Sequence, residues 1–105
     1  MMDKQTNIIL IELKNKILQK YKLIEMRLFG SKARGESNSY SDIDVFVRVS
    51  GVNRTIEEGI FDIAYETELT HGCLIDIFVF DDNALNGIHF WMPVYQKILQ
   101  EGLII

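Results

Sequence analysis

The chain has a single cysteine, Cys73, in 105 residues, so no disulfide can form within it. Sparse cysteine is typical of proteins in reducing compartments. Cys73 stands at the start of an apolar run, which favours a small core residue over a reactive thiol. The chain also lacks the ~20 consecutive apolar residues that a membrane span needs, and it shows no signal-peptide pattern. We therefore expect a cytoplasmic protein with no membrane partner.

The chain also has fewer basic than acidic side chains, 11 against 15, so its formal net charge is −4. Broad binding to a phosphate backbone needs a positive face, so nucleic acid is not an expected partner. Four lysines near the start suit the solvated side of a helix; they are Lys14, Lys16, Lys20 and Lys22. The length suits one domain over residues 1–105, which leaves a large substrate-recognition domain to another chain.

Several common phosphate and metal motifs are absent: GxxxxGK[ST], GxGxxG and HExxH do not occur. His71 and His89 have no metal-ligand spacing with Cys73, and we interpret both as ordinary surface or core residues. Ser31 is the serine with motif context, but no base accompanies it, which argues against a Ser-His-Asp hydrolase.

Helical and strand patterns alternate along the chain. Apolar spacings of three and four predict a helix over residues ~4–20, and β-type runs predict strands over residues 23–29, 42–49 and 74–80. A further helix is expected after a Thr55–Glu58 capping box, ending at His71-Gly72.

The remaining elements are short. Ser31 can cap a helical turn that Gly35 ends, and a polar loop follows from Glu36 to Ser41. A last helix is expected from Pro93 to Glu101, with a possible edge strand at residues 103–105. Together these elements predict an α/β (α+β) fold, in which helices pack on a small mixed sheet of three to four strands whose order stays open.

Three aspartates interrupt the apolar strands: Asp42, Asp44 and Asp76. Asp is depleted in strands, and an unpaired buried carboxylate is unfavourable. Side chains at i and i+2 share a face, so Asp42 and Asp44 lie on one side, and Asp76 can join them if its strand is a neighbour. Such a cluster repels itself, which divalent cations together with substrate phosphate would offset. The alternative is structural: Asp42 caps a turn, and Asp44 and Asp76 form ion pairs with Arg27, Arg48 or Lys32.

Gly30-Ser31 stands where the first strand turns into a short helix. A glycine there lets a phosphate approach the backbone, and the Ser31 hydroxyl can donate a further hydrogen bond. Lys32 and Arg34 are candidates for neutralising phosphate charge, although a solvated turn explains them equally well.

Residues 28–47, LFGSKARGESNSYSDIDVFV, resemble the signature of the nucleotidyltransferase superfamily that includes the DNA polymerase β-like enzymes. That signature is Gly-Ser, about ten residues, Asp-x-Asp on a strand, and a third acidic residue on a later strand. Here ten residues separate Ser31 from Asp42, and Asp76 stands in the third place. The similarity is greatest to the small minimal nucleotidyltransferase group, whose usual end resembles YQKILQEGL at residues 95–103.

The resemblance implies the nucleotidyltransferase fold, ATP as substrate and two Mg²⁺ ions as cofactors. It implies that Gly30 and Ser31 hold the β- and γ-phosphates and that Asp42 and Asp44 bind both ions. Asp76 would complete the catalytic ion and help to deprotonate or orient the acceptor hydroxyl.

Members of this group are commonly paired with a small helical HEPN ribonuclease toxin, on which they act as antitoxin by moving AMP onto a tyrosine. The resemblance therefore implies a HEPN-type partner, and both a homo-oligomer and a hetero-oligomer stay open. Two other functions stay open: a subunit that modifies a small molecule of the aminoglycoside type, and a non-catalytic module that neutralises a partner by contact. A nucleic-acid polymerase is the least favoured, because the charge has the wrong sign.

Overall fold

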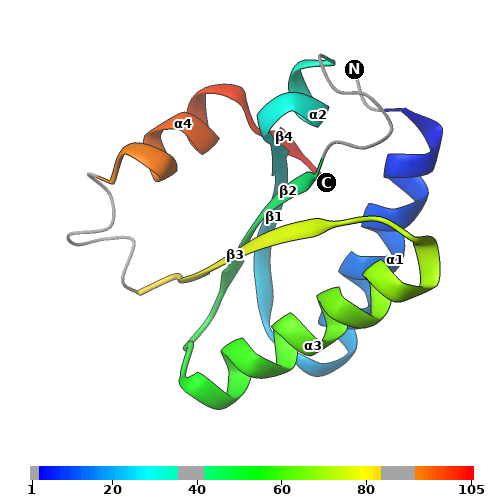
Figure 1. The fold of residues 1–105 in the computed structure, drawn as a ribbon. Helices are drawn as coiled ribbons and strands as arrows, with labels where there is room; N and C mark the ends of the chain where they lie inside the picture. The colour runs from blue at the N-terminus through cyan, green and yellow to red at the C-terminus, as the bar shows by residue number, and fades with distance from the viewer. Residues whose placement is uncertain (1–2, 36–41, 84–91) are drawn as a thin grey trace.

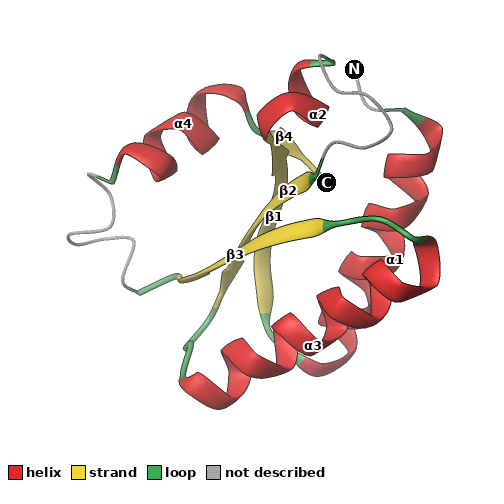
Figure 2. Ribbon diagram, in the orientation of Figure 1, coloured by secondary structure: helices red, strands yellow, loops and turns green. Residues whose placement is uncertain are grey.

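The computed structural model describes residues 3–35, 42–83 and 92–105. Its elements in chain order are α1 (Lys4–Lys20), β1 (Leu23–Phe29), α2 (Gly30–Arg34), β2 (Ile43–Val49), α3 (Arg54–His71), β3 (Ile75–Asp81), α4 (Pro93–Glu101) and β4 (Leu103–Ile104) (Figure 1, Figure 2). The expected helices and strands are present, with ends displaced by at most two residues. The loop expected at Glu36 to Ser41, and His89, lie outside the described residues.

The strands form one mixed sheet in the order β3-β2-β1-β4. β2 pairs in parallel with β3, whereas β1 runs antiparallel to both β2 and β4. Parallel neighbours need a long crossover, which α3 provides. The order that the sequence left open therefore puts the two aspartate-bearing strands side by side, and it confirms the α+β architecture.

One face of the sheet carries the main core. α1 and α3 lie side by side over this face, with α4 on the other side of the sheet (Figure 1). The residues that alternate inward from β2 are buried, as their apolar pattern predicts; they are Ile43, Val45, Val47 and Val49. Leu10, Leu13 and Ile17 of α1 pack against them, together with Ile60, Ile63 and Ala64 of α3.

The second face holds an aromatic cluster that the alternation pattern did not reveal. Phe46 lies in the same alternating set as Asp44 and Arg48, yet it is fully buried. Its ring packs 5.3 Å from that of Phe80 and 5.9 Å from that of Tyr95 on α4, measured between centroids. α4 thus covers the middle of this face.

Two expected helix caps are wrong. α3 is capped by Asn53, whose side chain accepts a 2.8 Å hydrogen bond from the Ile56 amide, and Glu58 instead pairs with Arg54. α2 begins at Gly30 without a side-chain cap, so Ser31 stands inside it. Asn is as good a cap as Thr, and in each case the chain enters the helix earlier than the motif suggested.

Cys73 and His71 behave as interpreted. Cys73 packs at the margin of the main core, where burial raises the pKa of its thiol. His71 lies 2.8 Å from a Glu12 carboxylate oxygen and joins α3 to α1. Among the residues that the structure describes, no helix combines the length and apolar character needed to cross a membrane.

The burial of the second face predicts how α4 responds to truncation. Ile98 is fully buried in the aromatic cluster, whereas the adjacent Leu99 is 38% exposed. We expect Ile98→Ala to reduce the free energy of unfolding by about 2–5 kcal/mol, because it leaves a cavity under α4. Leu99→Ala on the same helix should change it by less than about 1 kcal/mol. Urea denaturation measures both, and equal losses would contradict this packing of α4.

Candidate functional site

Asp44 and Asp76 are direct partners in the parallel register of β2 and β3. Neighbouring strands lie about 4.7–4.9 Å apart, and paired residues point to the same face. Both aspartates therefore lie on the face that α4 partly covers, next to the aromatic cluster. Asp42, just before β2, is exposed and completes the set. The structure thus brings together the three carboxylates that the sequence singled out.

The electrostatic environment of Asp44 reflects this crowding. Its pKa is raised, first by burial, then by the charge of Asp76 and then by that of Asp42. Arg34 and Lys97 oppose the shift and lower the pKa. Two cations and two other carboxylates therefore act on the half-buried Asp44.

Gly30 lies directly against Asp44. Its φ of +74° belongs to the left-handed region, which favours glycine. A Cβ built on Gly30 would come within 2.2 Å of the Asp44 Oδ2 atom. Two features of this position therefore require glycine: the left-handed backbone angle and the lack of space for a side chain beside Asp44. The contact packs the Gly-Ser turn against the Asp-x-Asp strand.

The residues after Gly30 point in different directions. Ser31 is half-buried, and Arg34 is exposed, with its Nη1 atom 2.9 Å from Glu101 Oε1 of α4. Lys32 is instead buried, and its Nζ atom lies 3.9 Å from Asp3 Oδ2 at the start of α1. Of the two candidate cations, Arg34 therefore lies with the carboxylates, while the ion pair of Lys32 ties α2 to α1.

Lys97 is the residue that sequence analysis missed. It stands four positions before Glu101, and helix residues at this spacing share a face. Because Glu101 reaches Arg34, that face of α4 is turned toward α2 and the carboxylates. Only the packing of α4 brings Lys97 near Asp44; the signal in the sequence was a lysine inside YQKILQEGL, with nothing to relate it to the distant aspartates.

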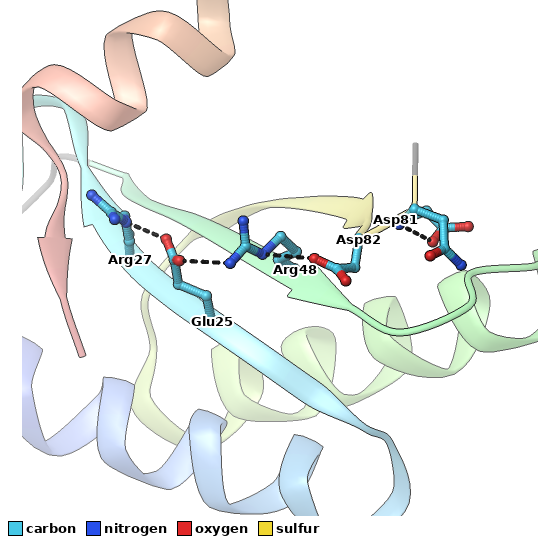
Figure 3. Close-up of polar contacts among 6 residues, drawn as sticks. Glu25, Arg27, Arg48, Asp81 and Asp82 are labelled. Atoms are coloured by element: carbon cyan, nitrogen blue, oxygen red, sulfur yellow. Dashed lines mark hydrogen bonds and ion pairs between the residues drawn. The ribbon is translucent and has the colours of Figure 1, made fainter. Parts of the chain in front are cut away.

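Arg27 and Arg48 do not pair with the site aspartates. Figure 3 shows a chain of ion pairs in which Glu25 contacts Arg27 and Arg48, and Arg48 contacts Asp82. The Arg48 guanidinium lies 3.1 Å from Glu25 and 3.3 Å from Asp82. The alternative that these arginines neutralise Asp44 and Asp76 is therefore wrong.

Within residues 3–35, 42–83 and 92–105, no group of three or more His, Cys, Asp or Glu side chains is arranged to hold a metal ion by itself. Mg²⁺ is usually held by one or two carboxylates together with substrate phosphates. The half-buried Asp44, crowded by like charges, has the donor chemistry for that kind of site.

The aspartates paired at the start of β2 and β3 and the glycine turn packed on Asp44 form one site on the mixed sheet. The family model of the nucleotidyltransferase domain matches residues 10–104, and the chain belongs to that family. It is therefore a nucleotidyltransferase.

Solved structures share its fold. A toxin–antitoxin complex with AMP-PNP matches with a TM-score of 0.62 and 19% identity, over 88% of this chain and 68% of that one. The MntA–HpeT toxin–antitoxin pair, in a variant with a tyrosine replaced by alanine, matches with a TM-score of 0.63 and 21% identity, over 94% and 69%. A structure described as a minimal nucleotidyltransferase matches with a TM-score of 0.59 and 22% identity, over 91% and 92%. Comparison with curated proteins found no match.

The contact of Gly30 predicts the effect of adding a methyl group there. Gly30→Ala has to bear a left-handed backbone and displace the Asp44 carboxylate. Gly51→Ala is the matched control, because Gly51 has a φ of +73° and nothing within 4 Å of an added Cβ. We expect Gly51→Ala to lower stability by about 1–2 kcal/mol through backbone strain alone. Gly30→Ala should lose about 1–3 kcal/mol more through overpacking. Chemical denaturation that finds equal losses would contradict the contact.

The crowding of carboxylates predicts that Asp44→Asn stabilises the metal-free protein at neutral pH. The pKa of Asp44 is raised in the folded state, so ionising this group disfavours folding as the pH rises through its titration range. Asparagine removes that charge. We expect a higher Tm for the variant in EDTA at pH 7, where each 1 kcal/mol corresponds to about 4–8 °C. The difference should shrink in acid, where Asp44 is protonated. A lower Tm at pH 7 would indicate instead that Asp44 has a stabilising ion-pair role.

Proposed function

We propose that the chain transfers AMP from ATP to a hydroxyl of a protein partner, a tyrosine of a helical HEPN-type toxin, and so acts as an antitoxin. The observation that carries the proposal is the register pairing of Asp44 with Asp76, with Gly30 held against Asp44. Two further findings support it. One related fold occurs in a toxin–antitoxin complex with AMP-PNP, and another in a toxin–antitoxin pair in which a tyrosine was changed.

The cations of the site bind the triphosphate in this proposal. Arg34 and Lys97 act on the Asp44 position from the side of α2 and α4, where the β- and γ-phosphates would lie against Gly30 and Ser31. Charge-assisted hydrogen bonds to phosphate are stronger than neutral ones. Lys32, tied to Asp3, would instead hold α2 in place.

The carboxylates orient the reacting groups. Asp42, Asp44 and Asp76 would hold two Mg²⁺ ions, which supply Lewis-acid charge at the transferred phosphate when they are bound. Asp76 is exposed, so it is open to an incoming hydroxyl, which it would orient and whose proton it would accept.

In the proposed step one phosphorus–oxygen bond forms and one breaks. The acceptor oxygen forms a bond to the α-phosphorus, and the bond from that phosphorus to the bridging oxygen of the β-phosphate breaks. Pyrophosphate leaves, and the proton of the hydroxyl passes to Asp76 and then to solvent. Neither oxidant nor reductant is needed.

Labelled ATP tests the proposal directly. The purified protein is incubated with Mg²⁺ and α-labelled ATP in extract from its own host, with γ-labelled ATP as control. We expect one labelled protein band with the α-label only, and no band with Asp44→Asn. Pyrophosphate release only with small hydroxylated acceptors would identify a small-molecule enzyme. The absence of both a labelled band and pyrophosphate would indicate a module that neutralises its partner by contact alone.

Lys97→Ala tests the phosphate role of α4. Loss of one charge-assisted contact is worth about 1.5–3 kcal/mol, so kcat/KM for ATP should fall by about tenfold or more. Lys16→Ala is the control, because Lys16 lies on α1, over the opposite face of the sheet, and pairs with Glu12 of the same helix. Steady-state kinetics of pyrophosphate release measure both variants. Equal kinetics would remove Lys97 from the site.

A further inference from the structure

A groove of about 490 Å³ lies between α3 and β3. Phe61 and Tyr65 of α3 form its apolar wall, and Ile77 of β3 lies opposite. Asp76 also lines it at the edge of the sheet, although its carboxylate belongs to the face that holds Asp44 rather than to the face that α3 covers. A segment that pairs with the β3 edge would pass Asp76, because its side chains alternate between the two faces of the sheet.

The groove follows the outer edge of the sheet. Among the strands that the structure describes, β3 is the terminal one in the order β3-β2-β1-β4, and its outer edge is the one considered for further pairing. The Ile43 amide donates to the Leu74 carbonyl, which turns the backbone groups of Asp76 toward β2 and those of Ile75 and Ile77 outward. The Glu68 carboxylate accepts a 2.7 Å hydrogen bond from the Ile75 amide. The next outward-facing backbone groups along the edge are those of Ile77.

The charge of the groove selects its occupant. Asp62, Glu68 and Asp76 are acidic and all line it. Phe61 is 42% exposed and Tyr65 is 60% exposed, and with Leu69 they form a stripe at intervals of four on α3. Acidic groups beside an exposed apolar stripe complement an extended segment that has both basic and apolar side chains.

We propose that this groove seats the acceptor: an extended, basic polypeptide segment that pairs with the β3 edge and turns its hydroxyl side chain toward Asp76. This inference rests on the proposed function, because it names the substrate that the same site would modify. It places the acceptor on the β3 side of the aspartates, opposite the side from which Arg34 and Lys97 act.

The first test measures binding without chemistry. The probe is a short peptide with one tyrosine flanked by lysines, and the comparison peptide has glutamates in their place. We expect the basic peptide to shift the amide NMR signals of Ile77 and Val79, and the acidic peptide to leave them unchanged. Equal shifts from both peptides, or shifts confined to other elements, would overturn the inference.

Charge reversal supplies the matched variants. Asp62→Lys changes the charge inside the groove, whereas Glu66→Lys makes the same change on α3 at an exposed position outside its lining. Asp62→Lys should weaken binding of the basic peptide by about tenfold, the equivalent of 1.4 kcal/mol, and Glu66→Lys should have little effect. Binding of Mg²⁺ with AMP-PNP should be the same in both variants, which checks that each is folded.

Transfer to the peptide separates the two proposals. Both proposals are supported if the peptide tyrosine acquires label from α-labelled ATP and only Asp62→Lys raises the KM for the peptide. Label that Asp62→Lys and Glu66→Lys affect equally would overturn the groove and leave nucleotidyl transfer standing. Specific peptide binding with no transfer to peptide or partner would support the groove as a docking site and refute the proposed reaction.

Discussion

The parallel pairing of β2 with β3 is the constraint on which the site depends. Parallel neighbours need a crossover, and α3 supplies it across one face of the sheet. The aliphatic residues of both strands turn to that face, so their aspartates are directed to the other one. A register slip of one residue would turn Asp76 into the core, where an ionised carboxylate is strongly disfavoured. The hydrophobic pattern that builds the core therefore also fixes the distance between Asp44 and Asp76.

The same packing keeps like charges together against their repulsion. Phe29, at the end of β1, is the register partner of Asp44 and is 7% exposed. Gly30 then brings the backbone of α2 against the carboxylate. These contacts restrict Asp44 and shield part of it from water, and that burial is the largest cause of its raised pKa. A carboxylate placed in advance and incompletely neutralised is suited to stabilise positive charge that arrives with a substrate.

Local sequence patterns predicted the helices, the strands and the three carboxylates. They did not predict which residues from distant parts of the chain pack against them. Asp42 and Asp44 could be assigned to one face because strand side chains alternate, a relation within three residues. Lys97 could not be found, since it approaches Asp44 only through the packing of Tyr95 and Ile98 on Phe46 and Phe80. Phe46 shows the same limit: its alternation groups it with polar residues, and only α4 buries it. The sequence predicts the same role for Lys32 and Arg34, although helix residues two positions apart are separated by about 200° and point to different surroundings.

Asp44 and Asp76 differ in access, and this difference gives the proposed reaction a direction. Asp44 is half-buried and lies toward Gly30, Arg34 and Lys97, whereas Asp76 is exposed and lies on the edge strand β3, beside the acidic groove. An in-line displacement needs the attacking and leaving oxygens on opposite sides of the phosphorus. In the proposed arrangement the anionic leaving group departs on the side with Arg34 and Lys97, and a basic acceptor arrives on the side with Asp62 and Glu68. The two sides carry opposite charges, so the wrong approach is disfavoured for both molecules: phosphate is repelled from the groove, and a basic segment is repelled from α2 and α4. A net charge of −4 is compatible with this polarity, because what matters for direction is where the charges lie rather than their sum.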